Sequence, residues 1–352
     1  MTKYYAIIRL GALGDCIHVL PTLAAWHRQE PDAHFVWITS PALIPLLQSL
    51  SEKLPITFIA MQKPKGWLAR ISEVWRLLQE LRPLNLQGVL NLHPNALTWI
   101  LSNGITTGWV ATYNKQKLSG SALQRRTTSR RHAVDDFYEP LRKHYNWREL
   151  AGAERYPALP IEMNASTTPK KGGIIGMIMG VGNQRPNRAW PLNHWEVLTH
   201  TLLEPNTFEK PVTLWFIGGP DERPLADALM QRVSSPHLVN HCGAWTLPQL
   251  AENLTRCDLV IGGDTGPLHV AGAVGANVLG LYAPTAVDRT GPLGSGAIQT
   301  LTPPENRSCW PCEAPKCPSA NDCLEATCMA AITPEQVVEA VKTLLSSKVL
   351  NA

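Results

Sequence analysis

The sequence predicts an α/β protein built from two doubly wound, Rossmann-like domains that face a central cleft. Three observations support this prediction. In the first half of the chain, short apolar runs typical of buried strands alternate with amphipathic helical runs. A polar stretch with proline and glycine, residues 163–173, then interrupts the pattern as a linker does. The alternation begins again after it, which indicates a second domain of the same class.

The first domain is expected to open with a strand over residues 4–10, a glycine turn and a helix. Further strands are predicted at 34–40, 56–61, 88–93 and 107–113, and helices at 42–50, 67–81 and 94–103. Strands that alternate with helices form parallel sheets, and such sheets bind ligands at the carboxyl ends of their strands. Residues directly after each strand are therefore the candidates for a functional site.

The second domain repeats this organisation. Strands are predicted at 172–180, 211–219, 258–264 and 278–284, and helices at 192–204, 222–233 and 247–257. A last helix is expected to begin at Thr333-Pro334-Glu335-Gln336, since a Thr at N-cap with Gln at N3 makes a capping box and Pro suits the first turn. We expect domains at 1–165 and 172–332, and a terminal helix within 333–352.

The composition narrows the class of protein. The chain has 352 residues, of which 44% are hydrophobic and 17% charged, and its net charge is only +4. This mild charge does not predict a nucleic-acid partner. No apolar run reaches the roughly 18 residues of a spanning helix, and a glycine and an acid come too early for a signal peptide. We expect a cytoplasmic protein, with a membrane surface as a further contact.

The first glycine turn, Gly11 to Gly14, is followed by Asp15, where a phosphate-binding loop would have no carboxylate. Asp15 either caps the following helix or takes part in chemistry. The spacing GALGD also differs from the G-x-G-x-x-G fingerprint of dinucleotide-binding domains, which disfavours a nicotinamide-dependent oxidoreductase.

A second turn, in LVIGGDTGPLHVAGAVG, joins a buried strand to a helix rich in small residues. Pro267 suits the first helical turn, and the free N–H groups at the start of a helix attract a phosphate group. Glycines allow a ligand to approach the main chain. These features predict a diphosphate site around Asp264, Thr265 and Gly266.

Four stretches together resemble glycosyltransferase family 9, the bacterial heptosyltransferases of lipopolysaccharide synthesis. They are RLGALGDCIHVLPTL, NRAWPLNHW (187–195), GGDTGPLHVAGAVG and the tail CWPCEAPKC…CMAAITPEQVVEAV, with RRHAVDDFYEPLRK (130–143) as a weaker match. The resemblance implies the two-domain GT-B fold, an N-terminal acceptor domain and a C-terminal nucleotide-sugar domain. It also implies transfer of heptose from ADP-heptose or a similar nucleotide sugar to a lipopolysaccharide inner core, or a related glycan or protein, with inversion and without a metal.

The same resemblance assigns roles to individual residues. Asp15 matches the proposed general base, which takes the proton of the acceptor hydroxyl. Arg188 stands where the family often has Lys, and it is expected to offset charge on the leaving group, although the two cations differ in geometry. Asp264 either binds sugar hydroxyls or orients its loop, and His269 either contacts phosphate or packs in the helix. The donor-binding residues expected are Asp264, Thr265, Gly266, Pro267, His269, Gly182 and Trp190.

The acceptor is expected at the carboxyl edge of the first domain. Gly11 and Gly14 lie in the turn, and His93 and Asn95 follow a strand. The basic run QRRTTSRRH (124–132) is predicted to be a loop, either solvated or binding anionic groups of the acceptor, and its charges also suit peripheral contact with the cytoplasmic face of an inner membrane. The arginines concerned are Arg125, Arg126, Arg130 and Arg131.

Five of the eight cysteines cluster near the C-terminus, with the spacing Cys309-x2-Cys312-x4-Cys317-x5-Cys323-x4-Cys328. Clustered thiols in a reducing compartment favour a metal site over disulfides, and four thiolates suffice for zinc or iron. Some family members have a similar cluster, which matches Cys309, Cys312, Cys317 and Cys328 and leaves Cys323 spare. A structural metal is therefore expected, with disulfides or free thiols as the alternative.

Two other functions remain open from the sequence. One is a sugar epimerase or hydrolase with the same GT-B fold, against which the basic acceptor-side loop argues. The other is a metal-bound interaction module without catalysis, against which the joint presence of Asp15, Arg188 and Asp264-Thr265-Gly266 argues.

Overall fold

A computed structural model shows two compact units of α/β structure. Unit 1 comprises residues 1–117 and 133–160, and unit 2 comprises 118–132 and 161–352. The structure describes residues 2–114, 131–161, 173–181, 186–205, 207–304 and 328–346. The predicted linker at 163–173 lies almost entirely outside the described residues.

Unit 1 is built on a five-stranded parallel sheet with the strand order β3-β2-β1-β4-β5. Each predicted strand is present, with ends that differ by at most two residues, because apolar runs mark strand centres better than strand ends. The strands are β1 (Lys3–Ile8), β2 (Ala33–Thr39), β3 (Ile56–Ala60), β4 (Leu86–Asn91) and β5 (Thr106–Thr112).

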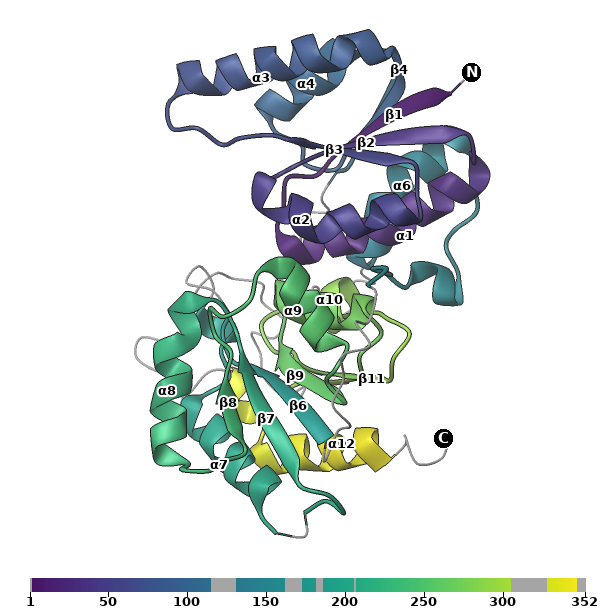
Figure 1. Ribbon diagram of the computed structural model, residues 1–352. Helices are drawn as coiled ribbons and strands as arrows, with labels where there is room; N and C mark the ends of the chain where they lie inside the picture. The colour runs from purple at the N-terminus through teal and green to yellow at the C-terminus, as the bar shows by residue number, and fades with distance from the viewer. Residues whose placement is uncertain are drawn as a thin grey trace. The chain divides into compact units, whose positions relative to one another are not determined.

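Helices cover both faces of this sheet (Figure 1). On one face lie α3 (Trp67–Leu81) and α4 (Ala96–Ile105), which pack on alternate residues of the strands such as Ala6 and Ile8. On the other face α1 (Leu13–Gln29) packs against α6 (Ala133–Tyr145). Both faces are therefore buried, and this explains why the strands are almost continuously apolar.

Two local expectations for unit 1 were incomplete. The predicted helix at 42–50 is broken into a 3-10 turn, Pro41–Leu43, one short helix α2, Ile44–Leu47, and a second 3-10 turn, Gln48–Glu52. Pro45 has no N–H to donate, so a continuous helix is disfavoured there. Helix α6 was not predicted, and it contains Pro140.

Unit 2 has a six-stranded parallel sheet with the order β11-β10-β9-β6-β7-β8. The four predicted strands form its centre, and the two short edge strands β8 and β11 were not predicted. The strands are β6 (Gly173–Ile178), β7 (Val212–Ile217), β8 (Leu238–Asn240), β9 (Leu259–Gly263), β10 (Val278–Leu281) and β11 (Ile298–Leu301).

The predicted helices of unit 2 are also present. Two of them, α7 (Leu192–Leu203) and α12 (Pro334–Ser346), pack against each other and share a core with the sheet. The others are α8 (Arg223–Arg232), α9 (Leu247–Leu254) and α10 (Gly266–Ala273), whereas the short helix α11 (Val287–Thr290) was not predicted.

The capping box predicted for the last helix is confirmed. Thr333 N donates to Gln336 Oε1 at 2.9 Å, and Gln336 N donates to Thr333 Oγ1 at 3.4 Å. The prediction of an α/β protein with two doubly wound parallel sheets is likewise confirmed. Among the described residues, no helix combines the length and the apolar character needed to cross a bilayer.

Candidate active site

The turn after β1 places Asp15 at the start of α1. Gly11 has a φ of +142°, a conformation that favours glycine, and α1 begins two residues later at Leu13. Asp15 occupies the third helical position, where its Oδ2 accepts a hydrogen bond from Ala12 N at 3.3 Å. The capping role considered for Asp15 is therefore realised in the structure.

Asp15 also forms an ion pair with Arg9, whose Nη2 donates to Asp15 Oδ2. Arg9 is only 8% exposed, and its guanidinium lies 4.9 Å from the centre of the Phe137 ring of α6. The Asp15 side chain is 36% exposed. Both contacts involve Oδ2, so Oδ1 has no hydrogen-bond partner among the described residues. A rigidly held carboxylate thus keeps one oxygen available to a ligand.

Arg9 was not identified from the sequence, although it lies within the motif RLGALGD. Its Nη1 donates to Leu92 O, at the end of β4, so it joins the carboxyl ends of two neighbouring strands. A signal was present, since an arginine that directly follows an apolar strand and precedes a glycine turn occupies the edge of the sheet where ligands bind.

A pocket of about 360 Å³ lies at this carboxyl edge of unit 1. It is open at the ends of β1, β3 and β4 and is flanked by the amino ends of α3 and α4. Its lining combines apolar side chains with cations and a histidine: Leu10, Met61, Gln62, Lys63, Arg70, His93, Asn95, Ala96 and Leu97. His93 and Asn95 were expected here because they follow a strand of a parallel sheet, and such sheets bind ligands at the carboxyl ends of their strands. The same reasoning, applied to the strand at 56–61, would have identified Lys63, which was missed.

Burial and the positive charges of Arg9 and Lys63 hold the pKa of His93 below its ordinary value of 6.5. The carboxylate of Asp15 and the main chain of Gly11 act on the ring in the opposite direction. His93 therefore lies in the electrostatic environment of Asp15. Asn95, in contrast, caps α4, because its Oδ1 accepts from Leu97 N at 3.0 Å and Thr98 N at 3.1 Å.

The basic loop is only partly described. Arg125, Arg126 and Arg130 lie outside the described residues. Arg131 and His132 belong to unit 2, where Arg131 O accepts a hydrogen bond from Arg289 and His132 Nε2 lies 3.0 Å from Gly291 O. The structure thus groups Arg131 with unit 2 and not with the turn that contains Gly11 and Gly14.

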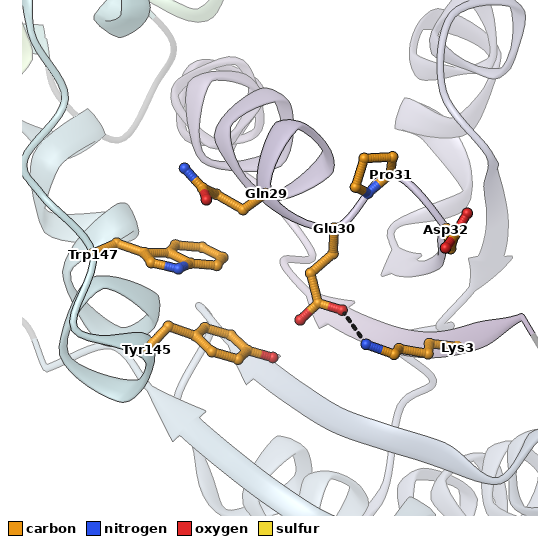
Figure 2. A pocket seen from close by; sticks show the side chains of 7 residues that line it. All are labelled: Lys3, Gln29, Glu30, Pro31, Asp32, Tyr145 and Trp147. Atoms are coloured by element: carbon orange, nitrogen blue, oxygen red, sulfur yellow. Dashed lines mark hydrogen bonds and ion pairs between the residues drawn. The ribbon is translucent and has the colours of Figure 1, made fainter.

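A second pocket, of about 300 Å³, lies at the opposite, amino-terminal edge of the unit 1 sheet (Figure 2). Two of its charged groups pair with each other, since Lys3 Nζ lies 3.0 Å from Glu30 Oε2, and Tyr5 also donates to that oxygen. Stacked rings of Tyr145 and Trp147 form one wall. These contacts suit a structural role at an edge away from the ligand-binding ends of the strands.

In unit 2 the turn between β9 and α10 contains the residues for which a diphosphate site was predicted. Thr265 is the N-cap of α10, Gly266 is its first residue and Pro267 lies in its first turn. The hydroxyl of Thr265 is shielded from solvent and has no hydrogen-bond partner among the described residues. Free N–H groups at the helix start and this hydroxyl together suit an anionic ligand.

The side chain of Asp264 is buried and held from three directions. Arg188 Nη1 lies 2.9 Å from Oδ2, His269 Nε2 lies 3.2 Å from Oδ1, and Thr290 Oγ1 donates to Oδ2 at 3.4 Å. Burial alone would raise the pKa of Asp264, but the hydrogen bond from His269 and the nearby positive charge outweigh it and lower the pKa. Of the two roles considered for Asp264, these contacts favour orientation of the loop.

The remaining expected donor residues fall into two groups. Trp190 is 4% exposed, its Nε1 donates to Ile332 O at 2.8 Å, and its ring packs edge-on against Trp195. His269 is also buried, in contact with Asp264. Both contacts favour structural roles over direct contact with a ligand. Gly182 lies outside the described residues.

The cysteine cluster is largely beyond the described residues, which exclude Cys309, Cys312, Cys317 and Cys323. Cys328 is described, and it lies buried in a 3-10 turn just before α12. Within the described ranges, no three side chains of His, Cys, Asp or Glu come together as a metal site.

Comparisons with known proteins agree on one family. Residues 74–321, more than half of the chain, match the family model described as glycosyltransferase family 9 (heptosyltransferase). The chain is 24% identical over 304 residues to the lipopolysaccharide core heptosyltransferase OpsX of Haemophilus influenzae, a match that covers 82% of each protein. It is 25% identical over 155 residues to lipooligosaccharide heptosyltransferase 2 of Campylobacter jejuni, which covers 44% of this chain and 47% of that relative.

The fold is similar to that of a solved structure of Escherichia coli ADP-heptose lipopolysaccharide heptosyltransferase II. The TM-score is 0.74 at 18% sequence identity, and the match covers 98% of this chain and 99% of that one.

Proposed function

The chain belongs to glycosyltransferase family 9, the heptosyltransferases, and on this premise we propose that it transfers a heptose from ADP-heptose to a lipopolysaccharide-core acceptor. The observation that carries the catalytic part of the proposal is the partly exposed Asp15 carboxylate, with Oδ2 held by Arg9 and Oδ1 without a partner among the described residues. The names of the curated relatives support the substrate class.

Asp15 acts as the general base in this proposal. Its Oδ1 accepts the proton of an acceptor hydroxyl while that oxygen attacks the anomeric carbon of the heptose. The new bond forms on the face opposite the diphosphate, the sugar–phosphate bond breaks, and ADP leaves with the bonding electrons. Arg9 holds the carboxylate in position, and the pocket that contains His93, Lys63 and Arg70 receives the anionic groups of the acceptor.

Unit 2 holds the donor. The hydroxyl of Thr265 and the N–H groups at the start of α10 bind the diphosphate. Arg188 lies beside this turn, with its Nη1 bonded to both the carboxylate and the main-chain oxygen of Asp264. Its positive charge stabilises the negative charge that develops on the departing diphosphate. Asp264 positions Arg188 and the turn, and does not itself bind the sugar.

The test is release of ADP from ADP-heptose in the presence of a lipopolysaccharide-core acceptor. We expect acceptor-dependent release by the parent protein and a loss of about 100-fold or more in Asp15→Asn and Asp15→Ala, with ADP binding retained. Asp32→Asn is the matched control, because Asp32 lies at the amino-terminal edge of the same unit. Release without acceptor would indicate a hydrolase and overturn the proposal, as would full activity of both Asp15 variants.

We also propose a structural metal bound by Cys309, Cys312, Cys317 and Cys328, with Cys323 as the alternative ligand. Support comes from thiolate chemistry and from Cys328, which is buried beside α12 in the core of unit 2. Such a metal would brace the segment before α12 and supply no step of the transfer. Elemental analysis of protein purified under reducing conditions is expected to give one zinc, or bound iron, per chain, and protein free of both would contradict the proposal.

A further inference from the structure

Helices α3 and α4 carry an unusual concentration of exposed apolar side chains. Eight large hydrophobic residues are exposed within the described part of the chain, and six of them lie on these two helices. The tryptophans are 62–70% exposed. The six residues, which we call the α3–α4 apolar surface, are Trp67, Leu68, Ile71, Trp75, Trp99 and Ile100.

Three of these residues form a row on α3 that lies beside α4. Trp67, Ile71 and Trp75 are spaced by four residues, so they follow one side of α3, and Leu78 continues the row. Gly104 of α4 comes so close to Leu78 that a Cβ atom there would lie 2.5 Å from Leu78 Cδ2. This row therefore runs on the side of α3 that adjoins α4, and the two helices lie side by side (Figure 1).

The margin of the surface is positively charged. Lys63, Lys65 and Arg70 are exposed at the amino end of α3, and no acidic residue occurs between positions 61 and 72 or between 92 and 114. The acids on the polar side of α3, Glu73 and Glu80, both pair with Arg76, at 2.8 and 2.6 Å. Residues 61–82 contain five lysines and arginines and two glutamates, so this segment keeps a net charge of +3.

The surface also adjoins the pocket at the carboxyl edge of unit 1. Lys63, Arg70 and Leu97 line that pocket and belong to the same ends of α3 and α4. A partner that covers the α3–α4 apolar surface would thus lie directly beside the pocket to which the acceptor is assigned.

We propose that the α3–α4 apolar surface docks the protein on an anionic lipid bilayer. Indole rings favour the headgroup region, and a cationic margin favours anionic lipids. A second copy of the chain suits the surface less well, because two identical cationic margins would repel each other. One part of the inference rests on the proposed function: if the acceptor is anchored in lipid, docking would present it beside the pocket at the carboxyl edge of unit 1.

The experiment is sedimentation of the full chain with vesicles of phosphatidylethanolamine and phosphatidylglycerol, and with vesicles of phosphatidylcholine alone. We expect binding to the anionic vesicles that weakens as salt is raised. The combined variant Trp67→Ser, Trp75→Ser, Trp99→Ser is expected to bind at least about 100-fold more weakly, and Lys65→Glu about tenfold more weakly. The double variant Tyr156→Ser, Val197→Ser is the matched control, because it removes exposed apolar side chains elsewhere and should bind as the parent does.

Each other outcome overturns the inference. These outcomes are failure of the parent to bind anionic vesicles, unchanged binding by the tryptophan variant, and self-association of the parent that only the tryptophan variant loses. Release of ADP with a detergent-dispersed acceptor is measured in parallel. It should be unchanged in the tryptophan variant, so a failure of the docking inference is distinguished from a failure of the proposed function.

Discussion

Arg188 and Asp264 form an ion pair in which Nη1 lies 2.9 Å from Oδ2, and the same nitrogen donates to the main-chain oxygen of Asp264 at 3.0 Å. One arginine therefore fixes both the side chain and the backbone of the residue that precedes the α10 turn. The family often has lysine at this position, and both residues supply a positive charge here.

Arg188→Gln is expected to lower the free energy of unfolding by about 2–4 kcal/mol, because a buried carboxylate loses its cation. His269 and Thr290 remain bonded to Asp264, so we expect the decrease in the free energy of unfolding to lie near the lower end of this range. Urea denaturation measures the effect. The double variant Arg188→Gln, Asp264→Asn should cost less than the sum of the single changes, and simple additivity would contradict the pairing.

Arg9→Gln removes the cation that pairs with Asp15 and changes no residue of unit 2. We expect kcat for acceptor-dependent ADP release to fall by about 10- to 100-fold, because the Asp15 carboxylate would no longer be held within reach of the acceptor hydroxyl. The affinity for ADP should stay the same. Arg9→Lys should recover part of the loss. Steady-state kinetics with isothermal titration of ADP separates the two quantities, and weaker ADP binding in Arg9→Gln would argue that Arg9 acts otherwise.

Thr265→Val keeps the shape of the side chain and removes its hydroxyl. If that hydroxyl donates to a charged phosphate, ADP should bind about 10- to 100-fold more weakly, as expected for a hydrogen bond to a charged group. Thr265→Ser retains the hydroxyl and should bind nearly as the parent does. Calorimetric titration of ADP checks both variants, and equal affinities for Val and Ser would show that the hydroxyl does not contact the ligand.

The lowered pKa of His93 gives a stability effect with a definite sign. Because the pKa of His93 in the folded protein lies below the ordinary 6.5, protonation of this side chain favours the unfolded chain. Well above pH 6.5 the histidine is neutral in both states and does not change the free energy of unfolding. As the pH falls through 6.5, His93 lowers the free energy of unfolding. His93→Gln should therefore lose less stability than the parent between about pH 7 and pH 5.5. Urea denaturation of both proteins at the two pH values tests this prediction. An equal decrease in the free energy of unfolding of the parent and of His93→Gln would refute it.

The chain's fold and family were predictable from its sequence, but the partners of individual side chains were not. The alternation of apolar strands with helices on both sides of a polar stretch was sufficient to predict the fold, and the family match confirms the resemblance carried by the four motifs. Arg9 and Thr290 were missed as partners of Asp15 and Asp264. Contacts of this kind depend on which strand ends adjoin, and strand order is not visible in local patterns.

Burial was the other property that local patterns did not reveal. Trp190 lies in a family motif, but the structure buries it against Trp195 and Ile332. Conversely, the periodicity of 67–81 predicts a helix correctly but does not show that half of its apolar side is left uncovered. Which face a helix buries is decided by its neighbours, here α4 and the sheet.

The assignment of Arg131 and His132 to unit 2 has a consequence for exchanging parts between related enzymes. The chain leaves unit 1, contributes to unit 2 and returns before α6, so a junction near residue 160 does not separate the two units. A hybrid joined there would combine His132 of one parent with Gly291 of the other, a pair that lies 3.0 Å apart in this chain. Hybrids meant to combine unit 1 of one parent with unit 2 of another should therefore take Arg131 and His132 from the parent that supplies unit 2.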